Sequence, residues 1–157
     1  MFEEIAGLPL HPLAVHAAVV FVPLLALAAL GYALVPPVRA RLEWVAVALA
    51  VLAPVSAVAA LLSGNAFAQR RGLPLDGALA DHRELGQVTM WAAVALGVAT
   101  LALVVFRRRG DSRLRTWVVG VLTVLVVLAA ATAGVSAVLS GDSGARMVWE
   151  PVWQLVG

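Results

Sequence analysis

Three histidines lie near the same end of a strongly apolar chain, and imidazole is the side chain that most often binds a metal. His11 and His16 fall at the start of the first long apolar segment, and His82 falls at the start of the third. Ionisable groups in or beside membrane-spanning helices are energetically costly, so they are functional candidates by default. The chemistry indicated is ligation of a haem or a metal ion near one membrane surface.

The composition is that of an integral membrane protein. The 157 residues are 62% hydrophobic, with a mean hydropathy of +0.97, well above the apolar fraction of soluble domains. The absence of cysteine excludes disulfides, covalently attached c-type haem, cysteine-ligated iron–sulfur clusters and a thiol nucleophile. Every basic residue is an arginine beside an apolar segment, which favours membrane orientation over nucleic-acid binding. We expect one integral membrane domain over residues 1–157, with the lipid bilayer as its surroundings.

Four apolar segments are long enough to cross a bilayer, which takes about 17–25 residues. They predict helices at about 12–35, 42–62, 82–106 and 114–139, followed by an interfacial tail over 142–157. The predicted stops are Pro36-Pro37, Ser63-Gly64-Asn65 and Ser140-Gly141-Asp142. Asp81 and Glu84 have the spacing of a capping box, which predicts that the third helix starts at about His82.

Arginines between these segments predict the orientation. Seven arginines lie in or beside the loops that follow the first and third segments, and four lie on the other side. The positive-inside rule then places both of those loops in the cytoplasm. The N- and C-termini and all three histidines are therefore expected on the extracytoplasmic side of the cell membrane.

The two halves of the chain carry related sequences. Val55–Val58 and Val135–Val138 both read Val-Ser-Ala-Val, at an offset of 80 residues, while the two Ser-Gly stops match at an offset of 77. A duplicated two-helix hairpin and a chance match in an Ala/Val-rich chain both explain this. Alanine stripes at 46, 50, 53, 57 and 60 and at 92, 95, 99 and 102 indicate close helix packing. The predicted fold is an all-α bundle of four transmembrane helices in up-down order.

In that order the first and third helices lie diagonally across the bundle, on the order of 13 Å apart when neighbours are about 8–10 Å apart. Two imidazoles that bind one metal through bonds of about 2 Å span a similar distance. We therefore expect haem b held by His16 and His82, with His11 as an alternate ligand or a hydrogen-bond partner. The role expected is one-electron transfer rather than catalysis, beside a respiratory or iron–sulfur partner. The other interpretation is that these histidines only fix helix ends by hydrogen bonds.

Two further functions stay open. A copper or zinc site could use His11, His16 and His82 with Asp81 and Glu84 as additional ligands. A structural subunit of a membrane complex would bind no cofactor, and a homo-oligomer is compatible with either role. No serine or threonine is accompanied by a base and an orienting acid at recognisable spacing, so hydrolysis is not indicated.

Both ends of the chain carry short motifs with a family likeness. The opening Leu10–His16 (Leu-His-Pro-Leu-Ala-Val-His) and the closing Gly144–Trp149 resemble the bacterial family called domain of unknown function 2231. The resemblance implies a four-helix membrane protein in which His11, Pro12, His16 and His82 occupy the family's motif positions. Some relatives are joined to a Rieske-type domain, which implies an electron-transfer setting. Ala17 replaces the family's usual aromatic residue, and no histidine follows the closing motif.

Overall fold

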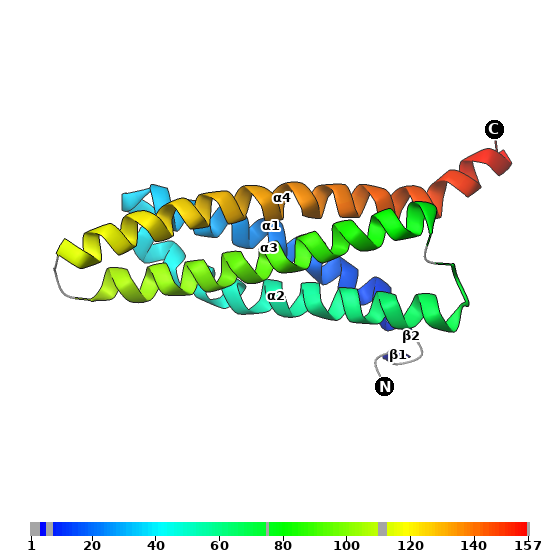
Figure 1. Cartoon of the computed structure of the whole chain (residues 1–157), viewed down its shortest axis with the longest axis horizontal. Coiled ribbons are helices and arrows are strands. Elements are labelled where there is room, and N and C mark those ends of the chain that lie inside the picture. Colours follow the sequence, from blue (N-terminus) through cyan, green and yellow to red (C-terminus); the bar gives the residue numbers. More distant parts are fainter. Residues whose placement is uncertain (1–3, 6–7, 75, 110–112, 157) are drawn as a thin grey trace.

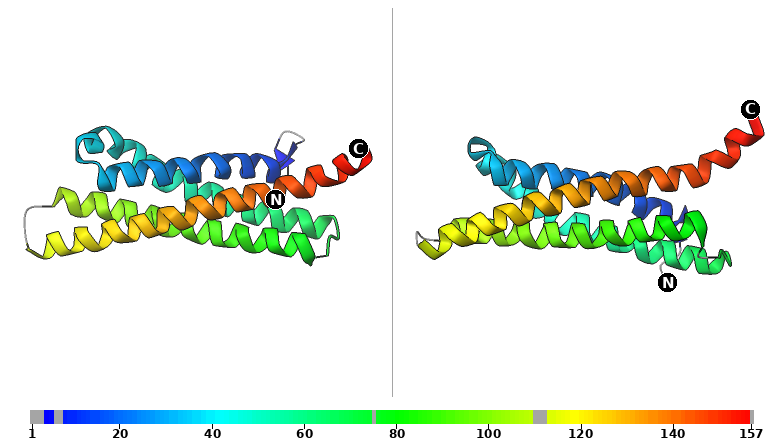
Figure 2. Two further views of the ribbon diagram at one scale, coloured as in Figure 1. Left: turned by 90° about the horizontal axis from the view of Figure 1, so that it is seen from above. Right: turned by 45° about the horizontal axis from the view of Figure 1, so that its top comes forward.

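The fold is a bundle of four long helices (Figure 1). The computed structural model describes residues 4–5, 8–74, 76–109 and 113–156. The helices are α1 (Leu10–Leu34), α2 (Arg39–Arg70), α3 (Gly77–Arg108) and α4 (Arg113–Val156). Two short strands, β1 (Glu4–Ile5) and β2 (Leu8–Pro9), pair antiparallel before α1, and the 3-10 helix η1 (Pro36–Val38) links α1 to α2. Successive helices run in opposite directions (Figure 2), which confirms the all-α, up-down prediction.

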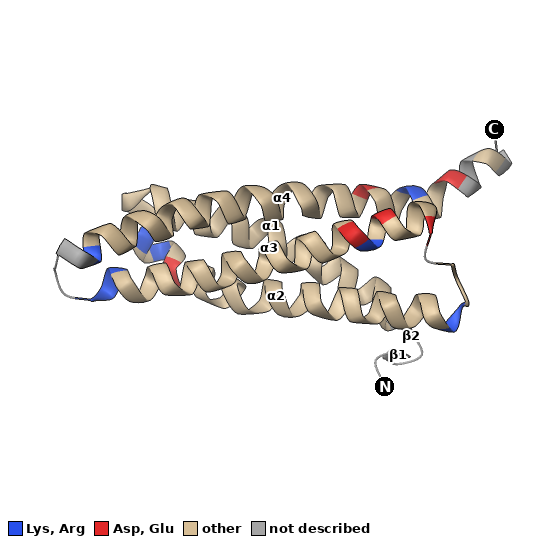
Figure 3. Cartoon of the chain, viewed as in Figure 1, with Lys and Arg blue, Asp and Glu red and all other residues tan. Residues whose placement is uncertain are grey.

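All four helices contain an apolar stretch long enough to cross a membrane. The shortest, α1, has 25 residues, or about 37 Å at 1.5 Å per residue, against a hydrocarbon thickness of about 30 Å. Charged residues gather at the two ends of the bundle and leave its middle uncharged (Figure 3). The chain is therefore built to span a lipid bilayer, with its histidines near one end of the bundle.

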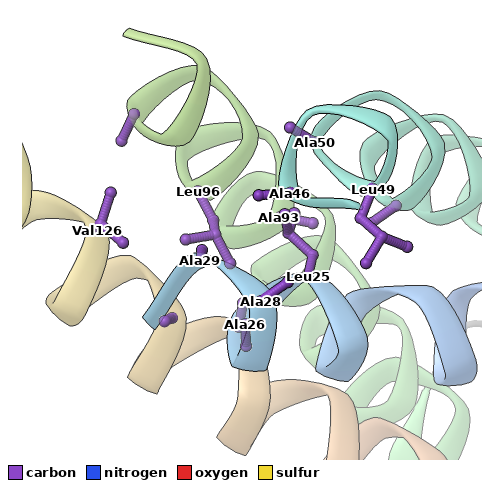
Figure 4. Close-up of a cluster of buried hydrophobic side chains, with 14 of the residues drawn as sticks. Leu25, Ala26, Ala28, Ala29, Ala46, Leu49, Ala50, Ala93, Leu96 and Val126 are labelled. Carbon is purple, nitrogen blue, oxygen red and sulfur yellow. The ribbon is translucent and has the colours of Figure 1, made fainter. Parts of the chain in front are cut away.

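Small side chains fill the centre of the bundle. Helices α1 and α3 each pack against both α2 and α4, and they also meet each other across the interior. Leu25 of α1 and Leu96 of α3 are fully buried there, beside alanines of α2 and Val126 of α4 (Figure 4). Since lipid tails are as apolar as leucine, close backbone approach rather than a hydrophobic drive holds such helices together.

Burial repeats along the chain in one uniform register. Buried positions on α2 recur 80 residues later on α4, at Ala46/Val126, Ala50/Ala130, Ala53/Ala133, Ser56/Ser136 and Ala57/Ala137. Buried positions on α1 recur 71 residues later on α3, at Ala18/Thr89, Val22/Ala93, Leu25/Leu96, Ala29/Thr100 and Tyr32/Leu103. The two helical hairpins are thus equivalent in packing, as a duplicated hairpin requires.

The predicted alanine stripes are correct on α2 and wrong on α3. Ala46, Ala50, Ala53 and Ala57 are buried, and Ala60 is half-buried. On α3, Ala95 is exposed, and the interior stripe instead passes through Leu96, Gly97 and Thr100. Spacing alone predicted a face of small residues, but packing against two neighbours selected a face with larger ones.

Helix α2 does not end at Ser63-Gly64-Asn65, as predicted, but continues to Arg70. The stop is Gly72, whose φ of 60° is left-handed. Gly72 N–H donates to the Gln69 carbonyl oxygen (3.1 Å) and Leu73 N–H to that of Ala68 (3.1 Å). This is the Schellman arrangement that ends helices at glycine. The earlier Ser-Gly pair is free of that duty.

The predicted ends of the two other helices are also corrected. Helix α3 starts at Gly77 rather than at His82, with Asp76 at the N-cap position, because the intervening Ala-Leu-Ala favours helix. Asp81 and Glu84 therefore lie within the helix and not in a capping box. Helix α4 continues through the predicted Ser140–Asp142 stop and the predicted tail to Val156. Ion pairs of Arg146 with Asp142 (2.8 Å) and Glu150 (3.9 Å) support that extension.

Arginines tie the helices together at the end opposite the histidines. The Arg107 guanidinium donates to the carbonyl oxygens of Tyr32 (2.6 Å) and Ala33 (2.8 Å) in the last turn of α1. Arg39 donates to the same two oxygens, at 3.1 and 3.3 Å. The buried Tyr32 hydroxyl donates to Glu43 (3.3 Å). Arg107, which the sequence marks only as a topology signal, thus also satisfies helix-end carbonyls that would otherwise lack donors.

Candidate functional site

His11 lies in the first turn of α1, half-buried against α2. Its Nδ1 is 3.1 Å from the Ala60 carbonyl oxygen and 3.3 Å from Ser63 Oγ. Its ring stacks on Phe67, with centroids 6.2 Å apart and planes inclined by 26°. Gly64 faces the ring so closely that a Cβ there would lie 2.8 Å from His11 Cε1. Helix α2 therefore fixes both the position and the rotation of this imidazole.

His82 has the corresponding surroundings on the other hairpin. It lies near the start of α3, half-buried against α4. Its Nδ1 is 2.8 Å from Ser143 Oγ, and it also interacts with the backbone of Ser140. A Cβ on Gly144 would lie 3.1 Å from His82 Cε1. Each imidazole thus has a serine at Nδ1 and the next residue, a glycine, beside Cε1.

The two histidines are equivalent in the bundle's internal repeat. His11 and His82 are separated by the same 71 residues that relate buried positions on α1 and α3, and Ser63 and Ser143 by the 80 that relate α2 and α4. The rings are also close enough to interact electrostatically. The sequence matched Ser63-Gly64 to Ser140-Gly141, whereas the structure matches them to Ser143-Gly144 without a gap.

The other predicted ligands lie elsewhere. His16 is exposed on the surface of α1, and its Nδ1 bonds the Pro12 carbonyl oxygen of its own helix (2.6 Å). Asp81 and Glu84 are exposed on α3. Among the described residues, no group of three or more His, Asp or Glu side chains is placed to hold a metal ion. The structure brings together His11 and His82, and it places His16 outside that pair.

Sequence reasoning assigned the wrong role to the residues that support the imidazoles. Ser63-Gly64 was read as a helix stop, and Ser143-Gly144 was used only as part of the closing motif. The signal that identifies them is the 80-residue offset of the Val-Ser-Ala-Val repeats, which reaches Ser143 when carried forward from Ser63. A gap of three residues, introduced to align the stops, concealed it.

Comparison with known families agrees with this architecture. A family model described as a predicted membrane protein, DUF2231, matches residues 7–154. The chain belongs to this family. The match covers both hairpins of this DUF2231 protein, including His11, Ser63, His82 and Ser143. No curated protein and no solved structure compared with the chain matches it.

Proposed function

We propose that this DUF2231 protein binds haem b between α1 and α3 through His11 and His82 and takes part in one-electron transfer. The observation that carries the proposal is the pair of equivalent, inward-placed imidazoles, each with Nδ1 already hydrogen-bonded to its neighbouring helix. Metal-ligating histidines characteristically donate one ring N–H to a carbonyl or hydroxyl while the other nitrogen binds the metal.

The donor set fits a haem better than a bare cation. A porphyrin supplies four nitrogens itself, so two imidazoles complete its coordination. A protein zinc or copper site ordinarily takes three or more side-chain ligands, and no such group occurs among the described residues. Gly64 and Gly144 leave the Cε1 edges of both rings without a facing side chain, so the imidazoles sit close to the backbones of α2 and α4.

Each part of the chain has a role in this proposal. When bound, the haem supplies a one-electron couple whose potential depends on its axial ligands and burial. His11 and His82 bind the iron, and the helices α2 and α4 orient the two rings. Phe67 stacks on His11 and shields that ring from water. A respiratory or iron–sulfur protein at the same membrane surface is the partner proposed.

The absorption spectrum of the purified protein tests this proposal. We expect a Soret band that shifts when the protein is reduced, together with haem near one per chain. Colourless protein with stoichiometric copper or zinc would replace the proposal with metal handling. Protein with neither, which co-purifies with a stable membrane partner, would replace it with a structural role.

Orientation is the second part of the proposal, and cysteine labelling tests it. We propose that the histidine end is extracytoplasmic, because seven of the eleven arginines lie toward the other end. The chain has no cysteine, so Leu73→Cys and Ala40→Cys each introduce a single thiol at an exposed site on opposite ends. A membrane-impermeant maleimide applied to intact cells should label Leu73→Cys and spare Ala40→Cys until the membrane is opened. The reverse pattern would invert the topology.

A further inference from the structure

We propose that Ser63 and Ser143 are a matched pair of positioning residues that hold His11 and His82 with Nδ1 protonated and Nε2 free to bind a ligand. The inference deepens the proposed function and names how that site is oriented. Its basis is the direction of the hydrogen bonds around each serine.

The bonds around Ser63 determine the proton on His11. Ser63 Oγ lies 2.7 Å from the Ala59 carbonyl oxygen and 3.1 Å from that of Ala60. Carbonyl oxygens only accept, so the single Ser63 hydroxyl proton is directed to one of them. The lone pairs of Oγ, and the Ala60 oxygen itself, then face His11 Nδ1 at 3.3 and 3.1 Å. Nδ1 must carry the proton, which leaves Nε2 of the neutral ring with its lone pair.

The same reasoning applies to His82 in the second hairpin. Ser143 Oγ donates to the Ser140 carbonyl oxygen at 3.0 Å. Its lone pairs are therefore available to His82 Nδ1, which lies 2.8 Å away. This ring is held by a shorter serine bond than His11 is, and no printed carbonyl contact matches the Ala60 bond of His11 in length. We expect Ser143 to matter more to His82 than Ser63 matters to His11.

The glycines that follow both serines are part of the same arrangement. A side chain at Gly64 would approach His11 Cε1 to 2.8 Å, and one at Gly144 would approach His82 Cε1 to 3.1 Å. Each ring would have to rotate away from its serine to relieve that contact. The Ser-Gly pair thus supplies an acceptor at Nδ1 and a space beside Cε1 on the same helical turn.

The chain offers its own matched control for the serines. Ser56 and Ser136 are also buried, are also 80 residues apart, and lie on the same two helices. Their hydroxyls bond only carbonyls of their own helices in the recorded contacts, Ala53 at 2.8 Å and Ala133 at 3.3 Å. Alanine at these positions removes a buried hydroxyl without touching either imidazole.

The test compares Ser63→Ala, Ser143→Ala and the double variant with Ser56→Ala and Ser136→Ala. Nitrogen-15 NMR of histidine-labelled protein without haem reports the tautomer of each ring. We expect Nδ1–H rings in the wild type and both controls, and mixed tautomers in the variants, most strongly at His82 in Ser143→Ala. Haem affinity should fall by about 10–100-fold in the double variant, the range for removing such supporting bonds.

The two readouts separate the inference from the proposed function. Tautomers that are unchanged in the double variant would overturn the positioning role, whether or not haem binds. A wild type that takes up no haem, but whose rings lose their tautomer in the double variant, would overturn the haem proposal and leave the positioning role standing. Equal affinity losses in the Ser56→Ala and Ser136→Ala controls would show that bundle stability alone was measured, and would overturn the positioning role.

Discussion

Alanine at His11 or at His82 is expected to remove the haem spectrum, whereas alanine at His16 is expected to leave it intact. His11 and His82 are half-buried and anchored by the neighbouring helix, but His16 is exposed and bonded to Pro12 of its own helix. Loss of an axial ligand should exceed the roughly 10–100-fold effect of losing a supporting bond. Absorbance spectra and haem titrations of the three variants measure the difference.

His16→Ala is the matched control in that series, because it lies on the same helix within about a turn and a half of His11. Folding of all three variants is checked by circular dichroism and by elution in detergent. Haem lost from His16→Ala and retained in His11→Ala would reverse the assignment and restore the His16–His82 pair expected from the sequence. An unchanged spectrum in His82→Ala would remove both pairings.

Gly97→Ala is expected to destabilise the bundle by about 3 kcal/mol, the upper part of the usual range for overpacking. A Cβ at Gly97 would lie 2.6 Å from the Ala50 carbonyl oxygen and 3.0 Å from Pro54 Cγ. Neither is the end of a flexible side chain, so α2 and α3 would have to separate. Proline has no N–H to bond the carbonyl four residues earlier, so Ala50 presents an unoccupied oxygen at this crossing. Unfolding in mixed detergent micelles measures the effect.

Two glycines of α4 provide the control for that substitution. A Cβ on Gly120 or on Gly134 would meet nothing within 4 Å, so alanine there should be neutral or stabilise the helix by up to about 1 kcal/mol. The other hairpin already shows the effect of removing the proline. Ala26 occupies the position equivalent to Gly97, and Gly134 the position equivalent to Pro54. Equal stability changes at Gly97 and Gly120 would refute the close crossing.

The helix count, the up-down order and the end that carries the histidines could all be predicted from the sequence. These follow from long apolar runs and from charges between them, which are local properties of the chain. Helix ends were less predictable, because Ser63-Gly64 and Gly72 are equally plausible stops by composition. Only the left-handed backbone of Gly72 and the packing of Gly64 against His11 separate a stop from a contact site.

The chain by itself determined that His11 and His16 lie on different sides of one helix, since five residues turn a helix by about 140°. Which of the two sides faces inward was decided only by tertiary packing, because both faces of α1 are apolar and lipid accepts either. Docking of α1 on α2 turned His11 toward Ser63 and left His16 on the surface. The internal repeat then placed His82 in the same relation to Ser143, and so defined a pair that residue spacing alone could not select.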